Sequence, residues 1–419
     1  MSSFVAGAAA ALFFLAFYSS SALGQSVPNL CRGELGDAGW DCDTLAPVPG
    51  QVFGGLEDLL PVPGSPDPSN PVLYKQIAGD PAAFDAATGE RSGDGGAAVF
   101  ALTEGSYWCM LAESDGEAAL FDAPEGSFVS SADEYPTGTW LSESIASILA
   151  PGTKLKYIVY THAHWDHIGG AGFVYDYFAL DEPTIIASKR IRADLKTKDD
   201  RDPSSAFGNT RGVPIPEKLE EEEYRELNVG GLQFDVQKIH GHERGDLFVF
   251  LDKTLPQNAA EGINSSIFMI VDVIFPGWAP FYSAAIGTDI GDFYDAMDEI
   301  LTYDFDLLVA GHLTRTGTKA DVQLQKYFFD DILEGMHLGI ATVAASDVVA
   351  GTGVFDPANP NAGNSWLLFN ELFERQADVC EAYVLDSAAR GRDWLAELGG
   401  VDLTLRSQCW VVSTTVRVG

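Results

Sequence analysis

The order of apolar and polar positions along the chain predicts strands that alternate with helices. Apolar runs at residues 97–102, 107–112 and 118–121, the last two separated by an Asp115-Gly116 turn, predict a series of hairpins. Further strands are predicted at residues 156–160, 183–187, 232–238, 247–251, 267–274 and 307–310. Apolar residues recur at helical spacing in residues 142–149, 189–198, 292–303 and 328–338. This order indicates two layers of sheet covered by helices.

The two ends of the chain differ from this middle part. Residues 1–24 contain a long apolar stretch with a small-residue end, which predicts a secretory signal peptide. Residues 25–89 begin with a Pro- and Gly-rich passage, so we expect an irregular N-terminal arm there. Residues 90–345 carry the alternating pattern and are predicted to form the main domain. Residues 346–419 follow as a C-terminal extension.

The C-terminal extension is predicted to be helical. A passage rich in Gly, Pro and Asn reaches residue 365, and apolar residues then recur at helical spacing over residues 368–384. That helix needs an apolar partner. Packing on the chain's own core is the first expectation, and covering a pocket or forming a dimer surface are the alternatives.

Composition and charge narrow the classes of partner. The chain has 419 residues, of which 46% are hydrophobic, so it is long and apolar enough to bury a core. Its 61 acidic and 25 basic residues give a formal net charge of −36. This charge repels phosphate backbones and anionic membrane surfaces, so we expect no nucleic-acid partner. No segment after residue 24 is long and apolar enough to span a bilayer, so no membrane association is expected after signal removal.

Five cysteines indicate an oxidising compartment with one thiol left over. Cys31 and Cys42 flank a short turn, and Cys380 and Cys409 are close in sequence, so we predict these two pairs as disulfides. Cys109 lies in an apolar run and is predicted to be a buried strand thiol. Together with the signal at residues 1–24, this cysteine usage predicts a secreted or extracytoplasmic protein.

The segment after the predicted strand at residues 156–160 concentrates metal-ligating side chains. His162, His164, Asp166 and His167 occupy six positions, and Gly169-Gly170 follows them. Residues two apart share a face only in an extended segment, so His162 and His164 can converge on one metal at a strand end. Asp166 and His167 then follow in a turn that can aim them at a second point. Imidazole and carboxylate suit a divalent ion such as zinc, and the segment indicates two neighbouring metals.

Three further candidates each end or interrupt an apolar strand. His242 lies in the turn before residues 247–251, Asp272 interrupts residues 267–274, and His312 follows residues 307–310. A lone carboxylate buried in a strand is costly without a cation or several donors. Asp272 is therefore predicted to bridge metals.

These segments, in this order, resemble the metallo-β-lactamase superfold of metal-dependent hydrolases over roughly residues 90–345. Residues 162–167 match its His-x-His-x-Asp-His signature, and residues 241–246 resemble its Gly-His-x-x-Gly-Asp turn. Asp122, in Phe121-Asp122-Ala123-Pro124, takes the place of a carboxylate that buttresses the metal loop. The resemblance implies an α/β fold, a four-layer αββα sandwich, here with an N-terminal arm and a helical C-terminal extension.

The resemblance also implies a set of metal ligands. It favours His242 over His240 as a ligand. One metal would be held by His162, His164 and His242, and a second by Asp166, His167 and His312, with Asp272 spanning both. The expected cofactors are two Zn²⁺ ions, with iron or manganese as alternatives. Asp166 is also expected to act in catalysis, by orienting the attacking oxygen or passing its proton.

The function implied is that of a secreted metal-dependent hydrolase. A metal-bridging hydroxide would cleave a small-molecule ester, lactone, phosphoester or sulfate ester. The best-known dizinc lactamases carry Cys in the place of Asp272, so antibiotic hydrolysis is not expected. A mononuclear-iron sulfur dioxygenase of the same superfold and a non-catalytic metal-binding protein are the alternatives. Residues 276–281 follow Asp272 and could line an apolar pocket wall over the metals, with core packing or loop bracing as the alternative for Trp278. For Arg315 an anion contact or a structural ion pair stays open.

Overall fold

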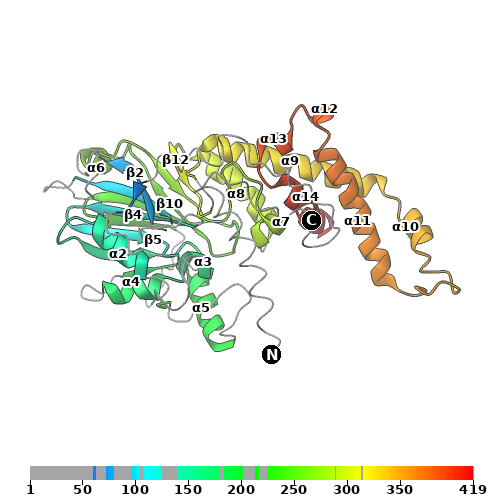
Figure 1. Cartoon of the computed structure of the whole chain (residues 1–419), viewed down its shortest axis with the longest axis horizontal. Coiled ribbons are helices and arrows are strands. Elements are labelled where there is room, and N and C mark those ends of the chain that lie inside the picture. Colours follow the sequence, from blue (N-terminus) through cyan, green and yellow to red (C-terminus); the bar gives the residue numbers. More distant parts are fainter. Residues whose placement is uncertain are drawn as a thin grey trace.

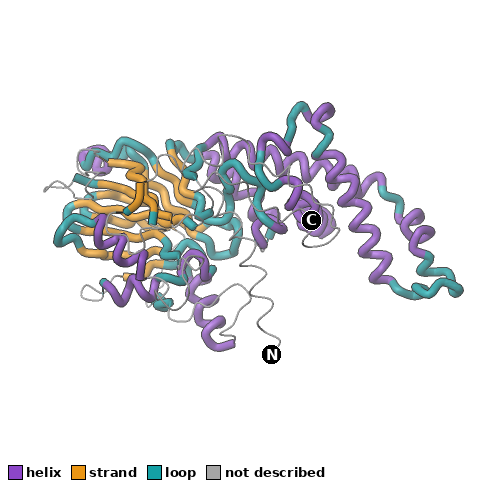
Figure 2. Tube along the Cα trace, viewed as in Figure 1, coloured by secondary structure: helices purple, strands orange, loops and turns teal. Residues whose placement is uncertain are grey.

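The computed structural model of the chain describes residues 60–62, 72–79, 96–103, 107–124, 139–178, 184–201, 213–216, 224–287, 289–312 and 315–418. The predicted signal at residues 1–24 and the predicted Cys31–Cys42 disulfide lie outside these residues. The strands form two sheets, with helices around them (Figure 2).

The first sheet has seven strands in the order β1 to β7. Neighbours are antiparallel from β1 to β5, whereas β5, β6 and β7 are parallel. The strands are β1 (Leu60–Pro61), β2 (Leu73–Gly79), β3 (Ala98–Thr103), β4 (Trp108–Ser114), β5 (Glu117–Phe121), β6 (Lys154–Val159) and β7 (Thr184–Ile186). The strands predicted from residues 97–121 are therefore present.

Strands β1 and β2 are the described parts of the region predicted as an N-terminal arm, residues 25–89. β2 pairs with β3 in the first sheet, and its Tyr74 and Ile77 are buried. The surrounding Pro- and Gly-rich sequence obscures this short apolar segment. Its stability comes from β3, a partner further along the chain, and not from a local pattern.

The second sheet has five strands in the spatial order β12, β11, β10, β9 and β8. Neighbours are antiparallel except β11 and β12, which are parallel. The strands are β8 (Tyr224–Val229), β9 (Leu232–Lys238), β10 (Leu247–Leu251), β11 (Ile267–Met269) and β12 (Leu307–Val309). β9 and β10 coincide with the predicted strands at residues 232–238 and 247–251.

Alternating side chains of the second sheet separate two apolar cores. On β10, Val249 and Leu251 belong to the core shared with the first sheet, whereas Phe248 and Phe250 belong to the other core. The shared core also takes in α2 (Thr139–Ile148), α4 (Ala171–Tyr177) and α5 (Lys189–Arg201), while α8 (Ile290–Thr302) and α9 (Lys319–Thr342) line the other. The predicted αββα arrangement of two sheets between helices is confirmed (Figure 1).

Three short helical segments lie in loops of this sandwich. They are α3 (Trp165–Ile168), α6 (Pro256–Ala260) and α7 (Tyr282–Ile286). α3 directly follows the first histidines of the predicted metal cluster, and α7 follows the loop after Asp272. Both segments are therefore close in sequence to predicted metal ligands.

The C-terminal extension consists of the helices α10 (Ala345–Thr352), α11 (Ser365–Val384), α12 (Ser387–Arg390), α13 (Trp394–Glu397) and α14 (Val401–Val418). Of these, α11 and α14 pack on the chain's own helix α9. α11 lies close against α9, because a Cβ placed on Gly339 would come within 2.6 Å of the Gln376 carbonyl oxygen. The Cys380–Cys409 disulfide joins α11 to α14, as predicted. α10 and α11 reach away from the sheets (Figure 1).

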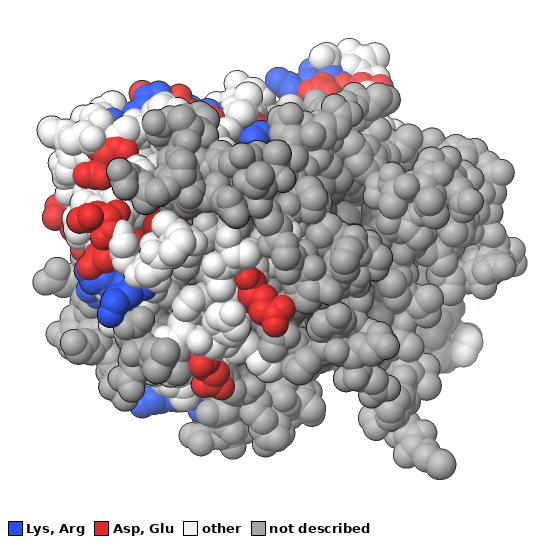
Figure 3. Space-filling view, turned by 60° about the vertical axis from the view of Figure 1, so that its left-hand side comes forward, with Lys and Arg blue, Asp and Glu red and all other residues white. Residues whose placement is uncertain are grey.

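Acidic side chains of the described residues lie in several separate groups on the face seen in Figure 3. This distribution fits a charged, solvated surface better than one acidic binding patch. Among the described helices, none is by itself both long and apolar enough to cross a membrane. α9 and α10 meet that criterion only as a pair bent by 70°.

Candidate metal centre

The histidine cluster lies just beyond the end of strand β6. The strand ends at Val159, and His162 and His164 follow in a bend, with their ring centroids 4.5 Å apart. The expected convergence of these two rings is present, but it occurs in the loop and not within an extended strand. Asp166 and His167 lie on α3, a single helical turn that begins directly after His164.

One group of side chains surrounds the Oδ2 atom of Asp272. This oxygen is 3.4 Å from His162 Nε2, 3.6 Å from His242 Nε2 and 4.0 Å from His164 Nδ1. His242 Nε2 is also 3.1 Å from His164 Nδ1. All four ligand atoms lie within 4.8 Å of one another, which is close enough to hold one metal ion.

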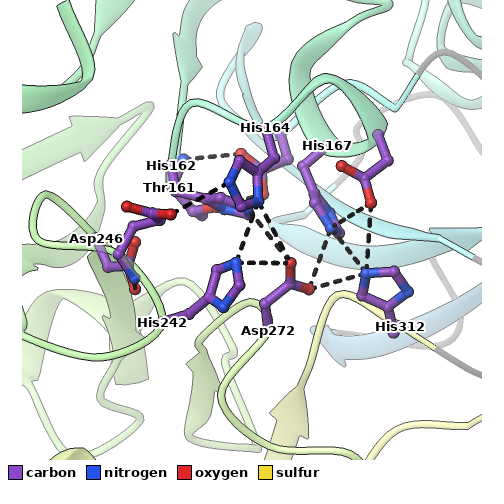
Figure 4. Close-up of polar contacts among 11 residues, drawn as sticks. Thr161, His162, His164, His167, His242, Asp246, Asp272 and His312 are labelled. Carbon is purple, nitrogen blue, oxygen red and sulfur yellow. Dashed lines mark hydrogen bonds and ion pairs between the residues drawn. The ribbon is translucent and has the colours of Figure 1, made fainter. Parts of the chain in front are cut away.

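A second group surrounds the other oxygen of the same carboxylate. Asp272 Oδ1 is 2.9 Å from His312 Nε2 and 3.1 Å from His167 Nε2. Asp166 Oδ2 completes this group at 3.6 Å from each of the two imidazole nitrogens. Figure 4 shows Asp272 between the two sets of histidines, with one oxygen directed to each. The structure thus brings all seven predicted residues together.

Asp272 adopts a backbone conformation that differs from the predicted strand. The predicted strand covered residues 267–274, but β11 ends at Met269 and Asp272 has a φ of 63°. A left-handed residue cannot continue a β ladder, so the chain turns here and directs the carboxylate at the histidines. The Asp272 N–H still donates to the Ala310 carbonyl at 3.3 Å, which keeps the turn tied to the segment before His312.

Asp122 supports the histidine loop through Thr161. Its buried carboxylate accepts hydrogen bonds from the Thr161 N–H at 2.8 Å and from the Thr161 hydroxyl at 2.6 Å. The Thr161 oxygen lies 3.2 Å from His162 Nδ1. Because the hydroxyl proton is directed to Asp122, the Thr161 oxygen accepts from Nδ1–H, and the Nε2 lone pair of His162 faces the centre.

Gly311 allows His312 to reach the centre. Its φ is +85°, and a Cβ added there would lie 2.4 Å from Val271 Cγ1. The Gly311 carbonyl accepts a hydrogen bond from the Trp108 N–H at 2.9 Å, which ties the segment to β4 of the first sheet. A side chain larger than hydrogen at this position would push His312 away from Asp272.

Electrostatic interactions within the centre favour negative charge on the Asp272 carboxylate. Burial alone would raise the pKa of Asp272, but the neighbouring His167 and His312 hold it well below its usual range. Burial would lower the pKa of His167, yet the carboxylates of Asp272 and Asp166 raise it to about 10. Hydrogen bonds to Asp272 and Glu243 outweigh burial at His164 and raise its pKa to about 9. Positive charge is therefore stabilised where a cation would bind.

Two other histidines of the centre are held neutral. Burial lowers the pKa of His162 and of His242 to about 3 in each case. Among the described residues, His162 Nε2 is a fully buried atom without a hydrogen-bond partner. A buried polar atom of this kind is costly unless an ion satisfies it. The donor set and this unsatisfied nitrogen therefore fit divalent metal ions.

The matched family agrees with this geometry. Residues 102–254 match the family model of the metallo-beta-lactamase superfamily. The chain carries a metallo-beta-lactamase superfamily domain. His162, His164, Asp166, His167 and His242 lie within the matched residues. Asp272 and His312 lie beyond them, and it is the structure that brings these two residues to the same centre. A comparison with curated protein sequences finds no significant match.

Several solved metallo-beta-lactamases are similar to the chain. A B3 enzyme described as the first with an active site glutamic acid is 15% identical, with 69% of this chain and 96% of that chain covered and a TM-score of 0.41. A Cronobacter sakazakii enzyme with a HARLDQ motif is 16% identical, with 70% and 93% covered and a TM-score of 0.36. A subclass B3 enzyme from a soil metagenome library is 15% identical, with 70% and 94% covered and a TM-score of 0.38.

Other residues singled out from the sequence lie outside the centre of the metallo-beta-lactamase domain. His240 is exposed and lies 3.7 Å from Asp292, so it is His242 that joins the cluster. Arg315 forms an ion pair with Asp321 at 2.6 Å at the start of α9, which is the structural alternative. Trp278 is buried and packs on Gly399 of the C-terminal extension, so loop bracing describes it better than a pocket wall.

Three further residues contact the cluster, and the sequence did not single out two of them, Glu243 and Tyr107. Glu243 Oε1 lies 3.4 Å from His164 Nε2, on the side of the ring away from Asp272. The Tyr107 ring centroid is 4.9 Å from that of His312, and the Phe281 centroid is 6.2 Å from it. Glu243 directly follows His242 in the turn, and that position was the available signal. Tyr107 had none, because its contact depends on the tertiary fold. Phe281 belongs to residues 276–281, the segment expected as a possible pocket wall.

Proposed function

We propose that the chain is a secreted hydrolase that uses two divalent ions, zinc in the first instance. The observation that carries the proposal is the placement of Asp272, whose two carboxylate oxygens face two different groups of ligand atoms. A carboxylate with one oxygen directed to each group of ligand atoms suits a dinuclear site. Metallo-beta-lactamase superfamily members are mostly metal-dependent hydrolases, which agrees with this proposal.

Each group of side chains has a role in the proposed reaction. His162, His164 and His242 would hold one ion and Asp166, His167 and His312 the other, with Asp272 between them. When bound, such ions polarise a carbonyl, phosphoryl or sulfuryl group and lower the pKa of coordinated water towards neutrality. Thr161 and Asp122 keep the tautomer of His162, and Glu243 accepts from the outer nitrogen of His164.

Asp166 is the proposed catalytic carboxylate. Its side chain is 26% exposed, whereas that of Asp272 is 3% exposed, so Asp166 lies at the accessible edge of the centre. From there it would orient the attacking water and take its proton. The proposed substrate is a small-molecule ester, lactone, phosphoester or sulfate ester. Secretion is proposed from the apolar stretch at residues 1–24, and the Cys380–Cys409 disulfide is compatible with it.

Metal analysis and a substrate panel test this function. Purified protein would be analysed for zinc, iron and manganese, and then assayed at metal saturation with p-nitrophenyl acyl, phosphate and sulfate esters. We expect about two divalent ions per chain and turnover of at least one ester class. One iron per chain without zinc would favour a mononuclear-iron dioxygenase. A metal-replete protein that cleaves none of these esters would contradict the hydrolase proposal.

A further inference from the structure

The segment α7 beside the metal centre has an unusual backbone. Ser283, Ala284, Ala285 and Ile286 all have positive φ angles, between 52° and 62°. The segment is thus a turn of left-handed helix built from residues other than glycine, and each such residue costs about 1–2 kcal/mol relative to the right-handed form. Contacts from outside the turn must stabilise it.

Those contacts come from the C-terminal helix α14. The buried Gln408 side chain accepts a hydrogen bond from the Ala284 N–H at 2.6 Å and donates to the carbonyl oxygens of Pro280 at 2.7 Å and Phe281 at 3.1 Å. The Ser407 hydroxyl accepts from the Ser283 N–H at 3.0 Å. The amide of Gln408 therefore uses its oxygen and both protons on the turn.

The residues on either side of this pair fix α14 to α11. Arg406 forms ion pairs with Glu374, Asp378 and Glu381 of α11, the one with Asp378 at 3.0 Å. Cys409 forms the disulfide with Cys380, also on α11. Of the four consecutive residues 406–409, the outer two thus bind α11 and the inner two bind the turn. Because α14 is fixed to α11 and bonded to the turn, the position of the turn depends on the C-terminal extension.

The turn borders the metal centre on two sides. At its start, the Phe281 ring centroid lies 6.2 Å from that of His312. At its end, Gly287 comes so near His242 that an added Cβ would lie 3.6 Å from the His242 carbonyl oxygen. Phe281, Tyr282 and Ile286 are exposed, with 41%, 66% and 40% of their surfaces accessible. Exposed apolar side chains beside a buried polar centre are typical of a substrate-binding wall.

We propose that the α7 turn is the apolar wall of the substrate site and that Gln408 is the positioning residue that holds it. The substrate therefore carries an alkyl or aryl group that packs on Phe281 next to the His312 side of the centre. This inference rests on the proposed hydrolase function for its substrate class. The role of Gln408 in holding the turn rests on the hydrogen bonds alone.

Gln408→Met tests the positioning role, since Met has a similar length and makes none of the three hydrogen bonds. Gln376→Met is the matched control, because Gln376 is a buried glutamine of α11 whose backbone packs against Gly339 of α9. Hydrogen exchange over residues 280–287 should be about tenfold faster in Gln408→Met, from a loss of roughly 1–2 kcal/mol. Gln376→Met should leave exchange of this segment unchanged. Unchanged exchange in Gln408→Met would overturn the positioning role.

Substrate chain length tests the apolar wall. The KM of Gln408→Met for p-nitrophenyl octanoate should rise about tenfold, with a much smaller rise for the acetate ester and little change in kcat. Phe281→Ala should likewise raise KM more for the octanoate ester than for the acetate ester. Because Phe281 is exposed, this variant is expected to fold normally. Equal changes in KM for the two esters would contradict the proposal that the α7 turn is an apolar wall of the substrate site.

A failure of the apolar-wall inference can be distinguished from a failure of the proposed hydrolase function. If the wild-type protein cleaves no ester, the hydrolase proposal fails, and binding of sodium octanoate and sodium acetate to the zinc-loaded protein replaces the kinetic assay. Octanoate should then bind more tightly than acetate, and Phe281→Ala should remove the difference. Equal binding of the two carboxylates would overturn the wall independently of activity.

Discussion

At the scale of single residues, the two acidic ligand candidates of the centre differ in their surroundings. Asp272 is buried and faces five histidines, so any substitution there removes contacts of both groups. Asp166 faces only His167 and His312 and is partly accessible. Asp272 would therefore only hold the ions, whereas Asp166 would hold one ion and also take part in proton transfer, so substitution of Asp166 gives the more direct test of chemistry.

Asp166→Asn should lower kcat of the metal-loaded enzyme by about 10²–10⁴-fold, because an amide accepts no proton from water. The fold and the thermal unfolding temperature should stay near those of the wild type. Steady-state kinetics at saturating metal, with metal content measured in the same sample, provide the check. Asp176→Asn, the same change at an exposed position on α4, is the matched control. Near-normal turnover of metal-loaded Asp166→Asn would remove this residue from the proposed mechanism.

Metal affinity should rise with pH because two histidines of the metal-free centre, His164 and His167, hold protons. The pKa values of His164 and His167 are raised to about 9 and about 10, so both are protonated at pH 7 and each must lose a proton to bind an ion. Each of the two association constants should therefore rise about tenfold per pH unit between pH 7 and 9. Competition titrations with a chromophoric chelator measure this slope. His240→Ala, at an exposed histidine outside both groups, should leave it unchanged, and a flat profile would refute the assignment.

At the scale of elements, short connections position the centre more than the strands do. α3 delivers Asp166 and His167, the turn at Asp272 follows β11, and Gly311 lies between β12 and His312. Each connection contains a conformation or a close approach that few residues allow. Gly311 is the clearest case, since both its φ and its contact with Val271 exclude a side chain.

Gly311→Ala should destabilise the protein by about 2–4 kcal/mol, as the sum of a left-handed conformation and an overpacked contact. It should also weaken binding of the ion beside His312. Gly116→Ala is the matched control, because Gly116 has a φ of +74° and nothing within 4 Å of an added Cβ. That variant should cost only about 1–2 kcal/mol and leave metal content unchanged. Chemical denaturation and metal analysis measure both; equal effects of the two variants would show that the contact with Val271 is unimportant.

The elements also show what the sequence could predict. β9 and β10 were predicted to the residue, because their apolar alternation and their turn residues agree. β2 was not, because it depends on pairing with β3 inside a Pro- and Gly-rich region. The left-handed turn at Ala284 and Ala285 carries no sequence signal, since neither residue type favours a positive φ.

Of the candidate site, the sequence predicted the seven residues that the structure brings together. Their residue types and motif spacing carry that information locally. Gln408 was missed, because it contacts the α7 turn across 124 residues of chain. Contacts of this separation are set by how α14 packs on α11, which no local pattern records.

At the scale of the whole molecule, the centre joins the two sheets. His162 and Asp166 follow β6 of the first sheet, whereas His242, Asp272 and His312 come from loops of the second. The Leu247 N–H donates to the Thr161 carbonyl at 2.8 Å and ties the sheets beside the centre. Bound ions would therefore connect the two halves of the sandwich.

Metal removal should lower stability as a result. Each ion present at about 1,000 times its Kd would contribute about 4 kcal/mol, so chelation should lower the unfolding temperature by several degrees. Calorimetry before and after treatment with EDTA measures the change, and added zinc should restore the original temperature. A chelated, metal-free sample that unfolds at the same temperature as the metal-loaded protein would contradict a metal link between the sheets.

The dependence of the α7 turn on Gln408 has a consequence for biosynthesis. The predicted ligands end at His312, and Gln408 is made roughly a hundred residues later, which takes roughly 5–20 s at ordinary rates of synthesis. Throughout this interval a growing chain holds every predicted ligand, while the left-handed turn lacks its hydrogen-bond partner. A chain released before residue 408 would therefore keep the predicted metal-binding residues without the ordered surface beside them.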